Sequence, residues 1–501
     1  MKINNKFLLI LLVLLSPVAA RSSVKLDFTT VDMLTFRLYQ EKKWDSLIGI
    51  GHQALRQDID YYYLRVRMGI AYFEQKEYFP ATTHLKKAMQ FNSGDQFVAD
   101  YLYRAYVYTN RPEEANILRK TMSPQARDTA LVSNAILQSV HVEAGYTFSS
   151  DRAPKNLTKL MDTANIYGEQ DLYGNSIYSN LSLNLRVSNR IGLTLAYNYL
   201  NFSKTKYIQY GQLEHQLTSI TDTSWGKLYN YATPNPWIIY DTSFKYQVKQ
   251  HEIHIGASIS SGAGFRIMPA FHLIHVAYTM TNITSGFETR QDPWYYTNFN
   301  STLYSLPFEQ LNYTFSQKDT SFNNYVAALE ITKDFGLFKA GLSGSWSNLN
   351  NKKQKQVGVS LTYFPLGNLN FYGTTAVTGF FQGKNKRLLL SQILGAKITS
   401  WLWGEVNFYY GDYTNANIFN GSIVYNNSDI IDYRGGATLI FAVSKHIQLS
   451  LIYQYFRKES EQIYYIKTPD TSNPGTFKEI PQTKNNPYNT NTIIGGITWK
   501  F

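Results

Sequence analysis

The last eleven residues of the chain alternate, except at Ile494, between two kinds of side chain, and this pattern constrains the fold more than any other. In an extended strand, successive side chains point to opposite faces. One face of this segment is apolar and aromatic and carries Ile493, Gly495, Ile497, Trp499 and Phe501. The other face is small or polar at Thr492, Gly496, Thr498 and Lys500. Such a strand is typical of a β-barrel whose outer face meets lipid.

The same alternation recurs throughout residues 138–501. Clear examples are the apolar faces of residues 181–187, 191–199 and 447–455. A spanning strand needs ~9–11 residues, whereas a spanning helix needs ~20 apolar residues, and no segment after residue 20 approaches that length. A closed barrel is then the remaining spanning structure, because it pairs every backbone group between strands. A soluble β-sandwich is disfavoured, because many apolar faces end in Tyr or Phe near the strand ends.

Strand count and orientation follow from the connections. We predict tight periplasmic turns at residues 188–190, 249–251, 334–336, 367–369, 400–402 and 444–446. Longer polar loops are predicted on the outside, at residues 150–175, 203–236, 281–322, 413–428 and 460–489. Short periplasmic turns and long outer loops are the habit of such barrels. Fourteen strands are readily placed, and residues 265–278 offer two more. We therefore predict an antiparallel transmembrane β-barrel of 14–16 strands, with 16 favoured.

The final strand resembles the terminal strand of bacterial outer-membrane β-barrels, in which a Gly is followed three and five residues later by apolar residues. Gly496, Trp499 and Phe501 match this assembly signal, whereas Ile494 departs from it, because a polar residue is usual there. The resemblance implies the outer membrane of a Gram-negative bacterium. It also implies outer-membrane lipid, lipopolysaccharide and the barrel assembly machinery as partners.

The beginning of the chain agrees with an exported protein. Lys2 and Lys6 precede nine apolar residues at 7–15, and Val18-Ala19-Ala20 follows as a small-residue cleavage site. We expect residues 1–20 to be a signal peptide, because nine apolar residues cannot cross ~30 Å of hydrocarbon. The chain has 40 Tyr and no Cys, with a mean hydropathy of −0.30. The missing cysteines exclude disulfides, thiolate metal sites and a lipoprotein anchor.

Residues 27–122 contain a repeat with a spacing of 34 residues. The aligned triplets are Leu38/Tyr72/Tyr106, Trp44/Tyr78/Pro112, Leu47/Ala81/Ala115 and Ala54/Ala88/Met122. This period resembles that of tetratricopeptide repeats, and the central copy matches at packing positions Gly69, Tyr72, Tyr78, Ala81 and Ala88. It departs from the family pattern at Arg65 and Ser93. We predict a periplasmic α-helical domain at 27–122, a linker at 123–137 and the barrel at 138–501.

Two further groups of residues are candidates for function. The inner faces of the predicted strands carry charged side chains that could line the lumen, at Glu143, Arg186, Asp241, Lys245, Glu330, Lys339, Glu405 and Arg434. Mixed charge inside a barrel is compatible with structural ion pairs or with a substrate path. Predicted outer loops carry aromatic residues held near prolines, which could contact sugars or the membrane interface, at Trp237, Trp294, Tyr295 and Tyr296.

Several kinds of chemistry are not expected. No Gly-x-Ser-x-Gly motif occurs, and the histidine pairs spaced by three lie on opposite strand faces, which disfavours shared metal ligation. We predict no catalytic residues, no metal and no cofactor. The formal net charge is +12, but no basic cluster with interleaved aromatic residues stands out. A nucleic-acid partner is therefore not expected.

The order of leader, helical repeats and barrel resembles outer-membrane exporters of exopolysaccharides, although their repeat arrays are much longer. We expect a barrel that passes a polysaccharide or small solute, with residues 27–122 docking a periplasmic protein partner or gating the barrel. The alternative is a non-conducting anchor or assembly scaffold that presents the helical domain. A weaker alternative is a lipid-modifying barrel enzyme.

Overall fold

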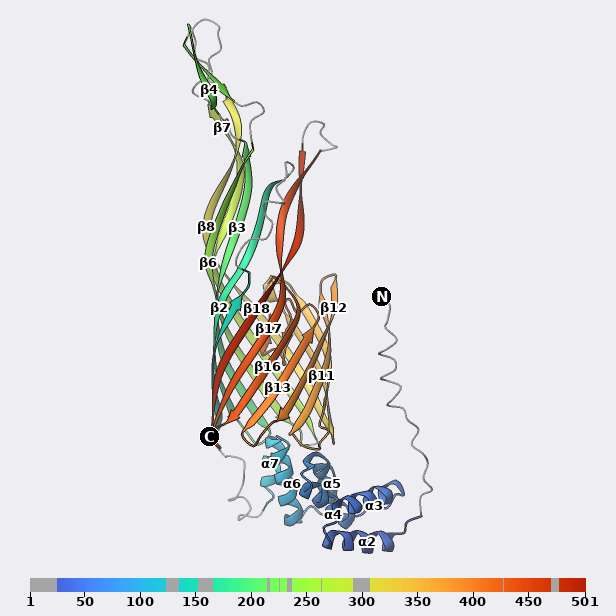
Figure 1. Cartoon of the computed structure of the whole chain (residues 1–501). Coiled ribbons are helices and arrows are strands. Elements are labelled where there is room, and N and C mark those ends of the chain that lie inside the picture. Colours follow the sequence, from blue (N-terminus) through green and yellow to red (C-terminus); the bar gives the residue numbers. More distant parts are fainter. Residues whose placement is uncertain are drawn as a thin grey trace.

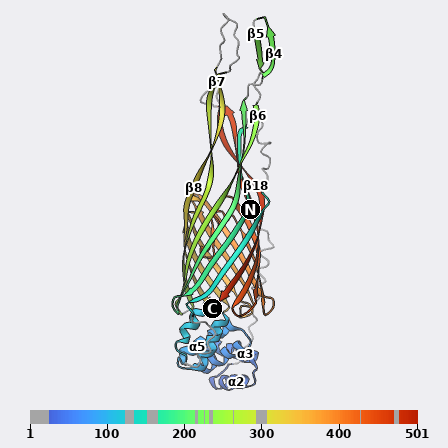
Figure 2. The same ribbon diagram turned by 90° about the vertical axis from the view of Figure 1, so that its left-hand side faces the viewer.

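The computed structural model describes residues 25–122, 135–151, 165–213, 217–224, 226–231, 237–262, 264–291, 307–426, 428–469 and 477–501. These residues form an N-terminal helical domain and a β-barrel (Figures 1 and 2). The helices are α2 (Phe28–Gln40), α3 (Trp44–Arg56), α4 (Tyr62–Glu74), α5 (Tyr78–Phe91), α6 (Gln96–Tyr108) and α7 (Pro112–Arg119). No described helix is both long enough and apolar enough to cross a bilayer.

The helical domain follows the 34-residue spacing of the sequence. Helices α2, α4 and α6 start at residues 28, 62 and 96, and α3, α5 and α7 start at 44, 78 and 112. The domain core is built from three of the repeated triplets, at Leu38/Tyr72/Tyr106, Leu47/Ala81/Ala115 and Ala54/Ala88/Met122. A Cβ atom at Gly69 would lie 2.6 Å from Leu85 Cγ, so a larger residue would separate α4 from α5. Tyr78 instead joins surface aromatic contacts with Phe73 and Tyr108.

Fourteen of the described strands close into an antiparallel barrel. In chain order they are β1 (Leu137–Ser149), β2 (Asn165–Arg186), β3 (Ile191–Leu213), β6 (Trp237–Ser260), β7 (Phe265–Gln291), β8 (Pro307–Phe335), β9 (Phe338–Ser347), β10 (Gln354–Tyr363), β11 (Phe371–Gln382), β12 (Asn385–Lys397), β13 (Leu402–Tyr410), β16 (Ile430–Ala442), β17 (Ile447–Pro469) and β18 (Phe477–Lys500). Two small hairpins stand apart from the wall: β4 (Leu217–Thr223) with β5 (Gly226–Tyr231), and β14 (Asn417–Ile418) with β15 (Ile423–Val424).

The expected sixteen strands are not observed, for two local reasons. Residues 265–278 belong to the single strand β7, because Pro269 stays in register with Leu329 of β8 and does not start a turn. Residues 249–251, predicted as a turn, lie inside β6, which ends only at Ser260, before β7 starts at Phe265. The predicted turn at residues 249–251 lies within one observed strand, and residues 265–278 were counted as two strands instead of one. The predicted count was therefore sixteen instead of fourteen.

Several strands run far beyond the length that a bilayer needs. Strand β8 has 29 residues, or ~95 Å at ~3.3 Å per residue, against ~30 Å of hydrocarbon. Strands β3, β6, β7 and β8 form one extension at the rim opposite the helices, and β17 and β18 form another (Figure 1). Much of the predicted loops 281–322 and 460–489 is therefore strand. The rim next to the helical domain is called the turn end here, and the opposite rim the loop end.

The outer wall is apolar and exposed around the barrel. The exposed residues include Ile253, Ile255, Leu329, Leu342, Val357, Leu451 and Ile497. An uncovered apolar band of this extent would be unfavourable in water and is the surface that a bilayer covers. The arrangement is therefore that of a membrane-embedded barrel.

Strand β18 closes the barrel against β1. Val140 pairs with Trp499, and the Phe501 N–H donates to the Gln138 carbonyl at 3.0 Å. The side chains of Trp499 and Phe501 are half exposed, with ring centroids 6.5 Å apart. A Cβ atom at Gly496 would lie 3.0 Å from Glu143 Cγ on the inner side. These positions suit an assembly signal, which itself stays a prediction.

Candidate functional site

The lumen contains a loop that the sequence indicated to be external. Residues 411–429, called the inserted loop here, leave β13 at the loop end and return to β16. Strands β14 and β15 make a short hairpin within it. Phe419, Asn420 and Gly421 at its tip have φ values of 50°, 54° and 78°. Only Gly takes such values without strain, and Asn tolerates them, so the tip is a tight left-handed turn.

The tip of the inserted loop contacts the wall made by β7 and β8. The Asn420 Nδ2 donates to the Met268 carbonyl at 2.7 Å, and Met268 is four positions from the turn at Gly264. His272 Nδ1 lies 2.8 Å from the Gly421 carbonyl oxygen. His272 Nε2 lies 3.1 Å from Glu252 Oε2 on β6. The loop therefore enters from the loop end and extends deep toward the turn end.

Other hydrogen bonds attach the inserted loop to β9, β10 and their connection. Gln356 accepts from the Asn417 N–H at 2.9 Å and donates to the Asn417 carbonyl at 2.8 Å. Asn417 Nδ2 also donates to Ser345 Oγ at 3.0 Å. The Asn350 N–H donates to Asn426 Oδ1 at 2.9 Å. Both sides of the loop are thus held by polar side chains, without any covalent link.

An apolar cluster anchors the two ends of the inserted loop. Tyr413 and Ala416 of the loop are buried against residues of the wall, namely Phe380, Leu389, Tyr409, Ile431 and Phe456. The Arg434 guanidinium donates to the Tyr425 hydroxyl and stacks on the Tyr409 ring, with 4.5 Å to its centroid. Arg387 donates to Asp412 and to the Thr414 carbonyl. Burial of these rings stabilises the inserted position of the loop.

Two connected cavities flank the inserted loop toward the loop end. The first, of about 390 Å³, lies between the loop and the wall made by β1, β2, β16, β17 and β18. Its apolar and aromatic lining includes Tyr178, Phe202, Val424, Ile452, Phe456 and Ile494. The second, of about 340 Å³, shares Tyr173, Phe202, Gln250 and Asn426 with the first. Both volumes are in the range of small-molecule sites.

Six of the eight predicted lumen residues lie on the inner side of the wall. Glu143 pairs with His141 at 2.8 Å, and Glu405 accepts from the Tyr372 hydroxyl at 2.7 Å. Glu330 and Lys339 line a cavity of about 200 Å³ beside the loop tip. Arg186 donates to Gln138 Oε1 at the turn end. Arg434 holds the inserted loop, as described above. These residues are dispersed over the wall and do not form one cluster.

Asp241 and Lys245 do not face the lumen, which corrects the prediction. On β6 the even-numbered residues face inward, because Val248 is buried with Ile274 and Val326. Asp241 and Lys245 lie on the opposite face of the extension beyond the barrel, where Asp241 accepts from Gln209 Nε2 at 2.7 Å. The error arose because the apolar face of this segment was taken as the lipid face. In the extension beyond the barrel, this apolar face of β6 points inward and packs against neighbouring strands.

The four aromatic residues predicted to contact sugars or the interface lie outside the described side chains. Trp237 begins β6, but its side chain is not described, and Trp294, Tyr295 and Tyr296 fall between the described residues 291 and 307. Their role stays a prediction.

The helical domain docks on the turn end through an apolar contact. Phe79 at the start of α5 stacks on Phe364 after β10, with ring centroids 3.9 Å apart at an interplanar angle of 20°. The Phe79 N–H donates to the Gly367 carbonyl at 2.9 Å. Asn368 Nδ2 donates to the Lys76 carbonyl at 3.0 Å. The turn between β10 and β11 thus binds the α4–α5 connection.

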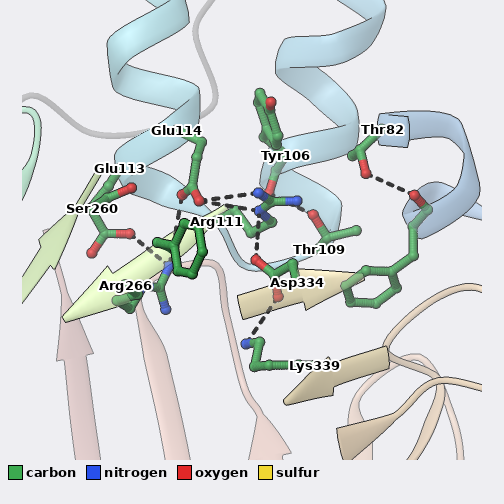
Figure 3. Close-up of polar contacts among 12 residues, drawn as sticks. Thr82, Tyr106, Thr109, Arg111, Glu113, Glu114, Ser260, Arg266, Asp334 and Lys339 are labelled. Carbon is green, nitrogen blue, oxygen red and sulfur yellow. Dashed lines mark hydrogen bonds and ion pairs between the residues drawn. The ribbon is translucent and has the colours of Figure 1, made fainter. Parts of the chain in front are cut away.

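A polar cluster forms the second docking contact, at the start of α7 (Figure 3). Arg111 lies 3.1 Å from Glu114 Oε1 and 3.4 Å from Asp334 Oδ2 on β8. Arg266 of β7 reaches Glu113 Oε2 at 3.0 Å and Glu114 Oε2 at 3.8 Å. Burial and the neighbouring Arg111 and Lys333 charges lower the pKa of Lys86 in α5. These ion pairs fix the helical domain to one side of the rim.

The docked domain leaves space on the other side of the rim. A cavity of about 440 Å³ lies between α7 and strands β1, β2, β3 and β6. Its lining includes Asn116 of α7 and Asn184, Arg186 and Thr194 of the wall. The helices therefore cover the turn end without sealing this side of it.

The inserted loop and the docking residues were missed by sequence reasoning. A usable signal was present in the loop, since Tyr413, Ile418, Phe419, Val424 and Tyr425 are unusually apolar for a solvated connection. The docking residues Arg111, Glu113 and Glu114 lie within the predicted helical domain, and nothing in the sequence marked them as contacts of the barrel. Their pairing with Asp334 and Arg266 links positions more than 150 residues apart and has no local signal.

A metal centre is not visible in the described part of the chain. There, no group of three His, Cys, Asp or Glu residues is placed to hold a metal ion. The expectation that the protein is not an enzyme stays a prediction.

Comparisons with known proteins give similarity of fold at low scores. No protein-family model matches the chain, and no curated protein matches it significantly. Solved structures with similarity include a Pseudomonas aeruginosa FadL homologue (TM-score 0.36, 8% identity, 76% of this chain and 93% of that one). Others are the P. putida toluene transporter TodX (0.36, 7%, 72% and 90%) and the translocator domain of the Neisseria meningitidis autotransporter NalP (0.27, 6%, 79% and 100%). At these scores the likeness carries no inference about what the chain binds or does.

Proposed function

We propose that this protein is an outer-membrane barrel that passes a small amphipathic solute, with the inserted loop as its barrier. In the proposed orientation in the outer membrane, the turn end and the helical domain face the periplasm and the loop end faces the extracellular side. One observation carries the proposal: an apolar, small-molecule-sized cavity lies beside a loop that crosses the lumen and is held only by noncovalent contacts. A loop held in this way can move without unfolding the wall.

The size and polarity of the lumen favour a small solute over a polymer. The cavities beside the loop measure about 340 and 390 Å³, and apolar and aromatic residues dominate the lining of the larger one. A glycan chain prefers a polar, continuous route and would need the whole loop to leave the lumen. Polysaccharide export therefore stays a hypothesis that requires a larger change of structure.

Removing the tip of the inserted loop tests the proposal directly. Replacement of residues 416–425 by a short Gly-Ser linker should raise single-channel conductance in planar bilayers, because the contacts to Met268, His272 and Gln356 disappear. Retained heat-modifiable migration on gels would show that the barrel still folds. A matched control replaces Lys384 and its neighbour Gly383, in the exposed turn between β11 and β12, and should not change conductance.

Locking the loop tests the same proposal in the opposite direction. The chain has no native cysteine, so Gly421→Cys with Ala328→Cys gives a single engineered pair. A Cys at the φ of 78° is strained equally in the reduced and oxidised forms, so comparison of the two forms isolates the effect of the disulfide. A Cβ atom at Gly421 would lie 3.3 Å from Ala328 Cβ, close to the ~3.5–4.5 Å of disulfides. Oxidation should abolish solute passage in proteoliposomes, and reduction should restore it. Passage that is equal in the two redox states would contradict a moving loop.

The second candidate is a non-conducting anchor for the helical domain. It is favoured by the docking of that domain through Phe79 and Arg111, together with a lumen filled by protein. If the loop-deleted barrel folds but conducts no more than the intact chain, the anchor function is supported instead.

A further inference from the structure

We infer that the cavity of about 390 Å³ binds an amphipathic anion, with its carboxylate at Lys458 and its apolar body pointing toward the turn end. The inference rests on the proposed function and specifies its solute. It also predicts the orientation of the bound anion, because the charged and apolar parts of the cavity lie at different positions along the barrel axis.

Lys458 is the distinctive residue of this cavity. It lies on the inner face of β17, in register with Ile431 of β16 and Tyr488 of β18. It lines the cavity, and its Nζ lies 5.2 Å from the Phe456 ring centroid. Within the described residues no carboxylate makes an ion pair with it. Lys458 is half-buried beside a lining that is apolar over most of its area, and a cation in such a place is costly unless an anion accompanies it.

Neighbouring lysines show how the other charges are neutralised. Lys204 Nζ lies 2.7 Å from Asp171 Oδ2, and Lys206 Nζ lies 2.9 Å from Glu169 Oε2. Both lysines line the adjoining cavity of about 340 Å³. The acid that influences Lys458, Asp429, accepts hydrogen bonds from the Tyr488 hydroxyl and from Ser428 Oγ. Among the described lysines that line these two cavities, Lys458 is thus the one without a carboxylate at ion-pair distance, which leaves it available to a ligand.

The opposite end of the cavity disfavours a second anion. Glu143 lines it there and pairs with His141 at 2.8 Å. Between Glu143 and Lys458 the apolar part of the lining is made by rings and aliphatic chains, including Tyr178, Leu200, Ile452 and Ile494, with polar side chains such as Gln454 and Thr492 among them. A molecule with one carboxylate and an alkyl or aryl body matches this sequence of surfaces. It would enter from the loop end with its apolar body first.

Binding measurements on the full chain in amphipol test the inference. The ligands are decanoate, its neutral counterpart decanol and the aryl carboxylate 4-butylbenzoate. The affinity for each is measured by calorimetric titration. Wild-type protein should bind the carboxylates about tenfold more tightly than decanol, which is one charge-assisted contact. Lys458→Met should remove this preference and leave decanol binding within about twofold. Decanoate and 4-butylbenzoate distinguish an alkyl from an aryl body.

Two further variants keep the test decisive. Lys458→Arg retains the charge and should retain the carboxylate preference, whereas Lys355→Met removes a lysine from the outer face of β10 and should change nothing. Wild-type protein that binds decanol as tightly as decanoate would overturn the inference, as would equal losses of both ligands in Lys458→Met. The conductance of the loop-deleted barrel is measured independently of ligand binding. Failure of the ligand assignment can therefore be distinguished from failure of the proposed channel function.

Discussion

At the scale of single residues, the alternation between neighbouring strand positions decides which substitutions matter. Leu195 and Thr194 are adjacent on β3, yet Leu195 is on the outer, lipid-covered face and Thr194 lines the cavity between α7 and the barrel wall. A charge at the outer position must enter hydrocarbon, whereas at the inner position it meets water. The same charged substitution therefore lowers the free energy of unfolding by different amounts at two adjacent positions.

This contrast predicts the effect of arginine at the two positions. Leu195→Arg should lower the free energy of unfolding by ~2–4 kcal/mol if it lies near the bilayer midplane. Thr194→Arg should cost less, chiefly the hydrogen bond from Thr194 Oγ1 to Asn184 Oδ1 at 2.8 Å. Denaturant unfolding in lipid vesicles, followed by tryptophan fluorescence, measures both. Equal costs at the two positions would show that the assignment of faces is wrong.

A buried histidine makes the helical domain sensitive to acid. Burial and the nearby Arg65 lower the pKa of His84 to about 3, from an ordinary value of 6.5. The folded domain therefore holds His84 neutral, and the stability it contributes is complete above pH 6.5 and lost as the pH falls toward 3. At pH 5 the loss should reach about 2 kcal/mol at most.

Hydrogen exchange of the α5 amides, corrected for the intrinsic rate, measures this loss between pH 7 and pH 5. His84→Leu removes the titrating ring and should reduce the pH dependence, although His52, whose pKa is also lowered by burial, contributes a part. Protection in α5 that does not change with pH in the wild-type chain would contradict the prediction.

At the scale of elements, one strand closes the wall and one connection fills it. Strand β18 pairs with β17 on one side and with β1 on the other, so it joins the two ends of the barrel. The inserted loop belongs to the connection between β13 and β16, and its hydrogen bonds reach β7, β9 and β10 across the lumen. Closure comes from backbone pairing, whereas filling comes from side chains.

Removing residues 499–501 should prevent closure. The truncation deletes the pairs of Trp499 with Val140 and Ile447, together with the hydrogen bond from Phe501 to Gln138. Heat-modifiable migration and protease resistance in membranes should both disappear. Lys500→Ala keeps the backbone and both aromatic rings and serves as the control. Unchanged heat-modifiability of the truncated chain would refute a closing role for this segment.

At the scale of the whole molecule, the barrel is covered at the turn end and filled from the loop end. The helical domain binds one side of the rim through Phe79 and Arg111 and leaves a cavity of about 440 Å³ on the other. The inserted loop fills the lumen above it. The two features lie in series along the barrel axis, so the more complete barrier dominates the flow.

This arrangement predicts unequal effects of removing each barrier. Deleting residues 27–122 alone should change conductance little, because the inserted loop still fills the lumen. The same deletion in the barrel that lacks residues 416–425 should raise conductance further. Planar-bilayer recordings of the four combinations test this order. A large increase after removal of the helical domain alone would make that domain the principal gate.

The sequence alone determined the class of the protein, because its signals are local. Period-two alternation needs only neighbouring residues, as in Ile493 to Phe501. The 34-residue period indicated a helical repeat, and the observed helices do start 34 residues apart. The count of sixteen strands failed at residues 249–251 and 265–278, where polar residues and Pro269 imitate turns inside long strands. Local polarity cannot show whether a chain is turning or leaving the membrane.

Only the tertiary structure decided what occupies the lumen and the mouth. The contact of His272 with Gly421 spans 149 residues, and that of Arg266 with Glu113 spans 153. His272, Arg266 and Glu113 are polar residues of the kind that also face solvent. No local sequence pattern therefore identifies them as contact residues. Which loop folds inward depends on the shape of the closed wall. Which of the described lysines has no ion pair depends on the neighbours that the wall brings together. Faces and periods are properties of the strand, whereas barriers and binding sites are properties of the closed barrel.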